Sequence, residues 1–176
     1  RGLAPGLPAV RSPRSRCPAP VKLSEVLPSA AIRLDLEGKD KWALIAELTD
    51  TLVASGQIRP EVRGAVHDAL VARERSMSTG MEKGIAIPHA SVEEVEHTVV
   101  ALGIAQGGVD FEAIDGQSTH LVFLLVNPSN RTKTHIRTLA EIARLTSSPE
   151  LRTALREAGS VEEVLDRIRS AESSVS

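Results

Sequence analysis

Five stretches of the chain space their apolar residues three or four positions apart, which is the pattern of amphipathic helices. The predicted helices cover residues 39–56, 60–75, 131–145, 149–159 and 161–170. Gly56 suits a C-terminal cap, and Ser148 can cap a helix whose first residue is Pro149. Ser160 and Glu163 have the spacing of a capping box for the last of these helices.

Four shorter stretches have the pattern of β-strands. Residues 31–36 alternate apolar and polar side chains, and residues 84–87 and 98–105 are runs of small and β-branched residues. Residues 120–126 are almost wholly apolar, which indicates a central strand covered on both faces. Strands interspersed with helices in this way predict a layered α/β fold.

Aromatic side chains are scarce in this chain. Trp42, Phe111 and Phe123 are the only ones, and there is no tyrosine. The length of 176 residues suffices for one domain with a sizeable core, which must be packed from aliphatic side chains. So few rings leave little on which bases could stack, and we expect no nucleic-acid partner.

Charge is distributed unevenly along the chain. Residues 1–20 hold four arginines, five prolines and no acid, and we expect them to form a disordered tail or linker. The remainder carries 17 basic and 23 acidic side chains, a poor complement to DNA or anionic lipid. No apolar run approaches the ~20 residues that span a bilayer. The single cysteine, Cys17, fits a reducing compartment, and we expect a cytoplasmic protein with no membrane insertion.

Most sequence motifs of enzyme active sites are missing. There is no P-loop for nucleotide phosphates and no G-x-S-x-G of a serine hydrolase. None of the five histidines has the spacing of a metal-binding pair, so we expect neither a metal nor a cofactor. If the chain carries out chemistry, histidine is the residue type best able to react.

His89 stands out among the histidines because of what precedes it. The predicted strand 84–87 ends on Pro88, whose ring fixes φ and removes an N–H donor, and His89 follows directly. Ser91 and Glu94 have capping-box spacing, which predicts a helix N-terminus favourable to anions just after His89. An ordinary exposed histidine is the simpler interpretation of His89 taken alone.

The segment that feeds this strand is rich in groups that bind phosphate. It brings Arg73, Arg75, Ser78 and Thr79 close to His89 along the chain. Guanidinium and hydroxyl groups are suitable partners for a phosphoryl group. At neutral pH an imidazole with an ordinary pKa of ~6.5 has a free lone pair that can attack phosphorus, and no metal is required if the donor is a phosphohistidine.

The other four histidines differ in their surroundings. His135 falls in the first turns of a predicted helix, where free N–H groups favour an anion. His67 lies on a helix among polar neighbours, His97 lies in an acidic segment, and His120 begins the apolar strand. We expect these three side chains to be solvated or to form hydrogen bonds with nearby groups.

Two motifs together resemble a known family. Residues 78–90, "STGMEKGIAIPHA", and residues 130–145, "NRTKTHIRTLAEIARL", are similar to the enzyme IIA domains of the phosphoenolpyruvate-dependent sugar phosphotransferase system. The likeness is to the fructose/mannitol type and nearest to the nitrogen-regulatory IIA proteins. It implies an α/β fold: a three-layer single domain with a mixed β-sheet flanked by helices, over residues 21–172, with 173–176 as a C-terminal tail.

The resemblance also implies roles for individual residues. His89 occupies the position of the phosphorylated histidine, modified on Nε2, and His135 that of the supporting histidine. Arg73 matches the arginine that stabilises phosphoryl charge, and Ser78 and Thr79 match the loop that supports the phosphate. The implied donor is a histidine phosphocarrier protein, and the implied acceptor is a IIB domain or a regulatory target protein.

Two functions from different classes fit these expectations. The first is a phosphohistidine carrier, a phosphotransferase whose partners dock on one shallow face with Met77 and Met81 at its rim. The second is a binding module that regulates a kinase or transporter without phosphorylation. The appearance of an acid-labile, base-stable phosphate on the protein distinguishes them.

Overall fold

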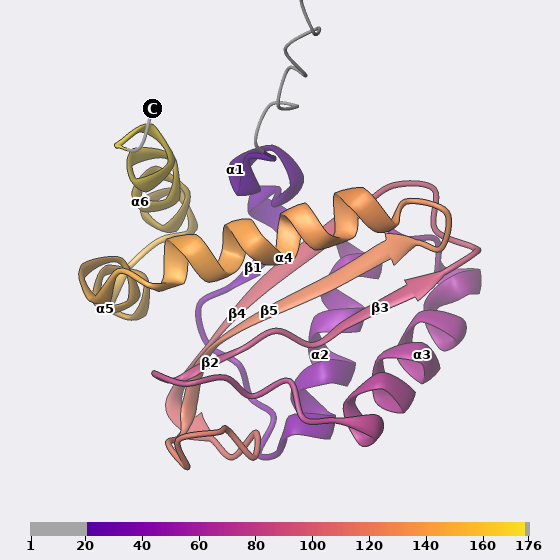
Figure 1. Ribbon diagram of the computed structural model, residues 1–176, viewed down its shortest axis with the longest axis horizontal. Coiled ribbons are helices and arrows are strands. Elements are labelled where there is room, and N and C mark those ends of the chain that lie inside the picture. The colour runs from indigo at the N-terminus through magenta and orange to yellow at the C-terminus, as the bar shows by residue number, and fades with distance from the viewer. Residues whose placement is uncertain (1–20, 175–176) are drawn as a thin grey trace, which may run out of the picture.

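The computed structural model describes residues 21–174, which form one mixed β-sheet flanked by helices (Figure 1). The strands are β1 (Ile32–Arg33), β2 (Ile85–Ala86), β3 (His89–Val92), β4 (Val99–Val109) and β5 (Thr119–Pro128). Strand β5 is antiparallel to β4 and parallel to both β2 and β3, and β1 is parallel to β4. The predicted mixed sheet is therefore confirmed.

Helices cover both sides of this sheet. The α-helices are α1 (Leu23–Val26), α2 (Lys41–Ala54), α3 (Arg63–Ser76), α4 (Thr132–Thr146), α5 (Pro149–Glu157) and α6 (Val161–Ser173). Short 3₁₀ turns, η1 (Ser29–Ala31) and η2 (Pro60–Val62), precede β1 and α3. Helices α2 and α3 lie along one side of the sheet and α4 along the other (Figure 1). This arrangement confirms the single α/β domain.

Strand β5 is the centre of the core, as its apolar sequence predicts. Every residue from Leu121 to Pro128 is buried, because β4 lies on one side and β2 and β3 lie on the other. The two phenylalanines, Phe111 and Phe123, are almost fully buried, and the rest of the core is aliphatic. The burial of one side chain of this size contributes roughly 1.5–3 kcal/mol.

The predicted helix ends are present. The Ser148 hydroxyl accepts from the Leu151 N–H at 3.2 Å, and that of Ser160 accepts from the Glu163 N–H at 3.1 Å. Gly56 follows the C-terminal cap of α2 with φ of 73°, a left-handed conformation that favours glycine.

The helix predicted to start after Ser91 is wrong. Residues His89–Val92 form strand β3, in which Ala90 and Val92 are buried and Ser91 is exposed. This alternation places the segment beside β5, where pairing and burial outweigh the local capping signal. His89 therefore begins a strand and does not precede a helix.

Pro88 interrupts the edge of the sheet without ending it. Ile85 pairs with Leu121 and His89 pairs with Leu125, so β2 and β3 keep one register along β5. The Pro88 carbonyl still accepts from the Leu125 N–H at 2.9 Å. The predicted stop is thus a break of two residues, after which the chain resumes pairing at His89.

The apolar face predicted for α2 is displaced by one residue at its start. Trp42 is 36% exposed, whereas its neighbour Lys41 is only 6% exposed. The Trp42 ring lies 4.9 Å from Lys41 Nζ and 5.6 Å from the Arg75 guanidinium carbon, within the range of cation–π contact. Lys41 is buried because it pairs with an acid from α3, described below.

Two predicted segments fall partly or wholly outside the described residues. The tail at 1–20 lies outside them, as do residues 175–176, while α6 extends through Ser173. Among the residues that the structure describes, no helix has the length and apolar character needed to cross a bilayer.

Candidate functional site

His89 is held by a hydrogen bond that determines which ring nitrogen is free. Its Nδ1 lies 2.8 Å from the carbonyl oxygen of Ile87. A carbonyl can only accept, so Nδ1 carries the proton and donates it. Nε2 is consequently left with its lone pair, so it is the ring nitrogen of His89 that is free to react.

His135 lies beside His89, as the sequence predicts. It is in the first turn of α4, and its ring centroid is 5.3 Å from that of His89 with the ring planes 52° apart. Its Nδ1 is buried and has no hydrogen-bond partner among the described residues. Strand β3 and helix α4 thus bring together two imidazoles that are far apart in the sequence.

Arg73 supplies positive charge to the same pair. It lies in the last turn of α3, and its guanidinium donates to the Met77 carbonyl at 3.0 Å. Its charge lowers the pKa of both His89 and His135. The three residues implied by the resemblance therefore come together from α3, β3 and α4.

Both imidazoles are favoured in their neutral form. Burial is the largest cause and lowers the pKa of His89 and of His135 below 6.5. The Ile87 carbonyl and the charge of Glu74 act in the opposite direction on His89. For His135 the charges of His89 and Arg73 lower the pKa further. A lone pair on His89 is thus available at neutral pH.

These shifts predict a dependence of stability on pH. Folded-state pKa values below those of the unfolded chain mean that the folded protein binds fewer protons. We therefore expect the free energy of unfolding to fall as the pH drops through 6.5, the ordinary histidine value, and below. Urea unfolding across this range measures it, and His135→Gln should make the decline shallower. NMR titration midpoints at or above 6.5 for both rings would contradict this prediction.

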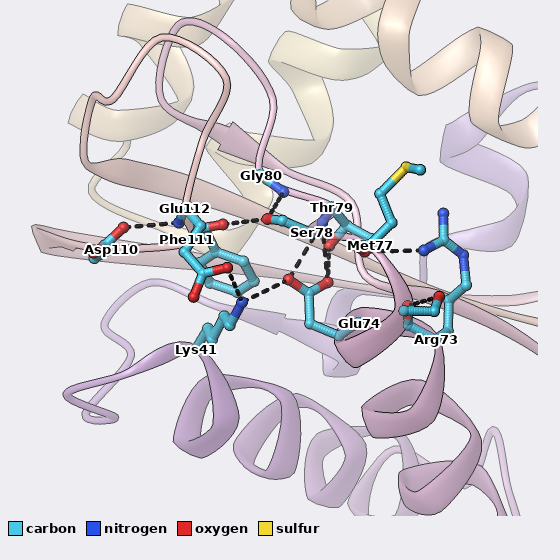
Figure 2. A network of polar contacts seen from close by, with 11 residues as sticks. Lys41, Arg73, Glu74, Met77, Ser78, Thr79, Gly80, Asp110, Phe111 and Glu112 are labelled. Atoms are coloured by element: carbon cyan, nitrogen blue, oxygen red, sulfur yellow. Dashed lines mark hydrogen bonds and ion pairs between the residues drawn. The ribbon is translucent and has the colours of Figure 1, made fainter.

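Ser78 and Thr79 have hydroxyl groups that are already engaged. The Ser78 hydroxyl donates to the Phe111 carbonyl and accepts from the Gly80 N–H at 3.1 Å, and that of Thr79 donates to Glu74 (Figure 2). Thr79 is buried and Ser78 is half-buried. Their support of a phosphate stays a prediction, and these contacts indicate that the two side chains shape the loop between α3 and β2.

Glu74 lies near the site, although no motif in the sequence singles it out. It is 2% exposed and accepts hydrogen bonds from the Thr79 N–H and hydroxyl and from Lys41 Nζ (Figure 2). Nothing in the sequence marks it as buried, because glutamate in a charged helix end is usually solvated. Only the fold reveals that it lies beneath the loop.

The predicted apolar rim is exposed. Met77 is 68% exposed and Met81 is 38% exposed, and both flank the loop that carries Ser78 and Thr79. Ile136, next to His135 in α4, is 61% exposed. Exposed apolar side chains around a polar centre are typical of a surface that binds another protein.

The remaining three histidines lie in other settings. His120 in β5 is satisfied, as expected, because its Nδ1 lies 3.0 Å from the Ala105 carbonyl oxygen. His67 lies on α3 with Nδ1 3.6 Å from an Asp68 oxygen, and His97 is exposed. Within residues 21–174 no group of three or more metal-ligating side chains comes together.

Comparison with known proteins identifies the family. The family model described as "Phosphoenolpyruvate-dependent sugar phosphotransferase system, EIIA 2" matches residues 25–171. The chain is 36% identical over 148 residues to a fructose-specific EIIABC component of Bacillus subtilis, covering 84% of this chain and 23% of that longer protein. It is 32% identical over 155 residues to a nitrogen regulatory protein of Escherichia coli, covering 86% of this chain and 92% of that one.

A solved structure agrees with this assignment. The nitrogen regulatory protein IIA-Ntr from Neisseria meningitidis matches with a TM-score of 0.75 and 33% identity, over 82% of this chain and 97% of that chain. The extent of the family match, the identities and the shared fold lead to one conclusion. The chain belongs to the EIIA 2 family of the phosphoenolpyruvate-dependent sugar phosphotransferase system.

Proposed function

We propose that this protein is a phosphohistidine carrier. His89 Nε2 accepts a phosphoryl group from a histidine phosphocarrier protein, and the group is then passed to a IIB domain or kept as a regulatory signal. The observation that supports this most strongly is the hydrogen bond from His89 Nδ1 to the Ile87 carbonyl, which leaves Nε2 as the nucleophile.

The transfer step balances without a metal or cofactor. The lone pair on His89 Nε2 forms the new N–P bond while the N–P bond of the donor phosphohistidine breaks, and that electron pair returns to the donor ring. The His89 ring becomes more positive, and the Ile87 carbonyl stabilises it by accepting a hydrogen bond from Nδ1–H, which keeps its proton. The protein contributes position and charge stabilisation, which are the main terms in phosphoryl transfer.

Arg73 and His135 have distinct proposed roles. Arg73 carries a permanent charge close to both imidazoles and stabilises the oxygens of the phosphoryl group. His135 has an unpaired ring nitrogen in a buried position 5.3 Å, ring to ring, from His89. A phosphoryl oxygen would supply the partner that this ring lacks.

The choice between transport and regulation draws on the relatives. One relative is a fructose-specific component whose name joins A, B and C units, and others are nitrogen regulatory proteins. Both uses need the same docking face, and the exposed Met77, Met81 and Ile136 suit it. A cytoplasmic location is part of this proposal, since the proposed donor and acceptor are proteins of that compartment.

A binding module that works without phosphorylation is the alternative. Such a module has no need of a fixed tautomer or of two neutral imidazoles, so the geometry favours the carrier. The test is to supply phosphoenolpyruvate and the upstream carriers and to look for an acid-labile, base-stable phosphate on the protein. Its absence, with a known IIA domain labelled in parallel, would leave the binding module as the function.

His135→Ala should slow transfer without abolishing it. The variant keeps the nucleophile and Arg73 but loses the neighbouring ring, and the loss of one donor of this kind costs roughly 10²-fold. Rapid-quench labelling gives the rate, and circular dichroism checks the fold. A rate equal to that of the unaltered protein would remove His135 from the mechanism.

A further inference from the structure

A buried polar network lies beneath the loop between α3 and β2 (Figure 2). The Glu74 carboxylate accepts from the Thr79 N–H with both oxygens, at 3.2 and 3.1 Å, and from the Thr79 hydroxyl. Lys41 Nζ lies 3.3 Å from Glu74 and 3.1 Å from Glu112. The Glu74 side chain is 0% exposed and that of Lys41 is 8% exposed, so the core of this network is sealed from solvent.

A short path of hydrogen bonds leads from this network to the nucleophile. Glu74 holds the backbone of Thr79, and the Thr79 carbonyl accepts from the Ile87 N–H at 3.1 Å. The Ile87 carbonyl in turn accepts from His89 Nδ1 at 2.8 Å. Ile87 is thus held at its N–H by the loop, and its carbonyl fixes the tautomer of His89.

The loop is fixed from its other side as well. The Ser78 hydroxyl donates to the Phe111 carbonyl, and a Cβ on Gly80 would lie 2.5 Å from that same oxygen. Met81 N–H donates to the Ile85 carbonyl at 2.7 Å. This close approach requires glycine at residue 80. With the loop fixed on this side, its position depends chiefly on its contacts with Glu74 on the other side.

Glu74 also determines where its neighbour can point. In Figure 2 the Glu74 side chain turns toward Lys41 and Thr79, and Arg73 turns the other way, toward Met77. Because the two residues are consecutive on α3, anchoring Glu74 sets the rotation of the helix end that presents the Arg73 guanidinium. The Glu74 carboxylate therefore restrains both His89 and Arg73.

The buried ion pair of Glu74 with Lys41 is not explained by its contribution to stability alone. A buried ion pair often contributes no more than well-packed apolar residues of similar size. Burial lowers the pKa of Lys41, but hydrogen bonds with Glu112 and Glu74 outweigh it and raise the pKa overall, so the lysine stays charged. The directional contacts of Glu74 with a backbone N–H are what an apolar replacement could not reproduce.

We propose that Glu74, held by Lys41, is a positioning residue. It sets the tautomer of His89 through the backbone of Thr79 and Ile87, and it sets the place of Arg73 through the end of α3. Its effect on transfer rests on the proposed function above. Its effect on the His89 tautomer does not, because that can be measured on the protein before any phosphorylation.

The test is Glu74→Gln, which keeps size and shape but removes the charge and one acceptor. We expect ¹⁵N NMR of the His89 ring to change from a single Nδ1–H tautomer to a mixture, and transfer to slow by roughly 10- to 100-fold, the effect of a small misplacement. Circular dichroism should remain that of the unaltered protein.

The matched control is Glu141→Gln. Glu141 is another buried acid, 9% exposed, whose partner is Arg144 in the same helix and not the loop. It should leave the His89 tautomer and the rate unchanged. If Glu74→Gln does not fold, the double variant Lys41→Met with Glu74→Gln, which removes both charges, carries the same expectation.

Two outcomes overturn the proposal. A folded Glu74→Gln protein with a single Nδ1–H tautomer and an unchanged rate would show that Glu74 does not position the site, and a tautomer change of the same size in Glu141→Gln would show general loosening. If the unaltered protein accepts no phosphoryl group while Glu74→Gln still alters the tautomer, the proposed function fails and the positioning role stands.

Discussion

His89→Ala is expected to accept no phosphoryl group from the upstream carriers. The substitution removes Nε2 of His89, which the hydrogen bond from Nδ1 to the Ile87 carbonyl leaves free and which is the proposed nucleophile, so the proposed attack on phosphorus cannot occur. His89 is half-buried at the start of β3, and its backbone pairing with Leu125 does not depend on the side chain. The fold should therefore persist.

The measurement is the labelling of purified variants with radioactive phosphoenolpyruvate in the presence of the carriers. His97→Ala serves as the matched control, because His97 is exposed in a different segment and should be labelled normally. Phosphate on the His89→Ala protein at the level of the control would refute the assignment of the nucleophile.

Arg73→Ala should produce the second-largest loss. A fixed positive charge directed at developing negative charge contributes about 10²–10³-fold to a rate, and Arg73 is the cation whose charge reaches both imidazoles. Arg73→Lys should recover part of the rate, since lysine restores a charge but not the planar fork of donors. Single-turnover transfer from the phosphorylated carrier gives the rates.

A second readout separates charge from structure in this prediction. The charge of Arg73 lowers the pKa of His89 and His135, so its removal should raise both titration midpoints. Arg75→Ala is the matched control, because Arg75 lies two residues away and its guanidinium is over the Trp42 ring. An Arg73→Ala protein with unchanged midpoints and an unchanged rate would exclude Arg73 from the site.

Much of the fold could be predicted from local patterns. The helix limits at Ser148 and Ser160 follow from side chains that cap the helix on which they stand, and this chemistry is local. The central position of β5 follows from its unbroken apolar run. These features depend on residues close together in the sequence, which is why the sequence suffices for them.

Features that depend on distant partners could not be predicted. The segment from His89 to Val92 pairs with β5 although Ser91 and Glu94 have the spacing of a helix cap, because the partner strand lies far along the chain. Lys41 is buried in place of Trp42 because Glu74, from another helix, pairs with it. For the same reason, no sequence motif marks Glu74 as a buried residue.

The proximity of the site residues could be predicted from the sequence only in part. The motifs around His89 and His135 resemble those of the family and so suggest that the two rings meet, but their 5.3 Å separation is a product of the fold. The tautomer of His89 depends on the Ile87 carbonyl, whose orientation no sequence pattern specifies. The chemistry of the site is thus predictable in kind, and its geometry is not.

The most direct test of the central claim is ¹⁵N and ³¹P NMR of the phosphorylated protein with labelled histidine. We expect one phosphorylated nitrogen, Nε2 of His89, with the proton on Nδ1 retained in its hydrogen bond to the Ile87 carbonyl. Phosphate on Nδ1 of His89, or on any other residue, would contradict it.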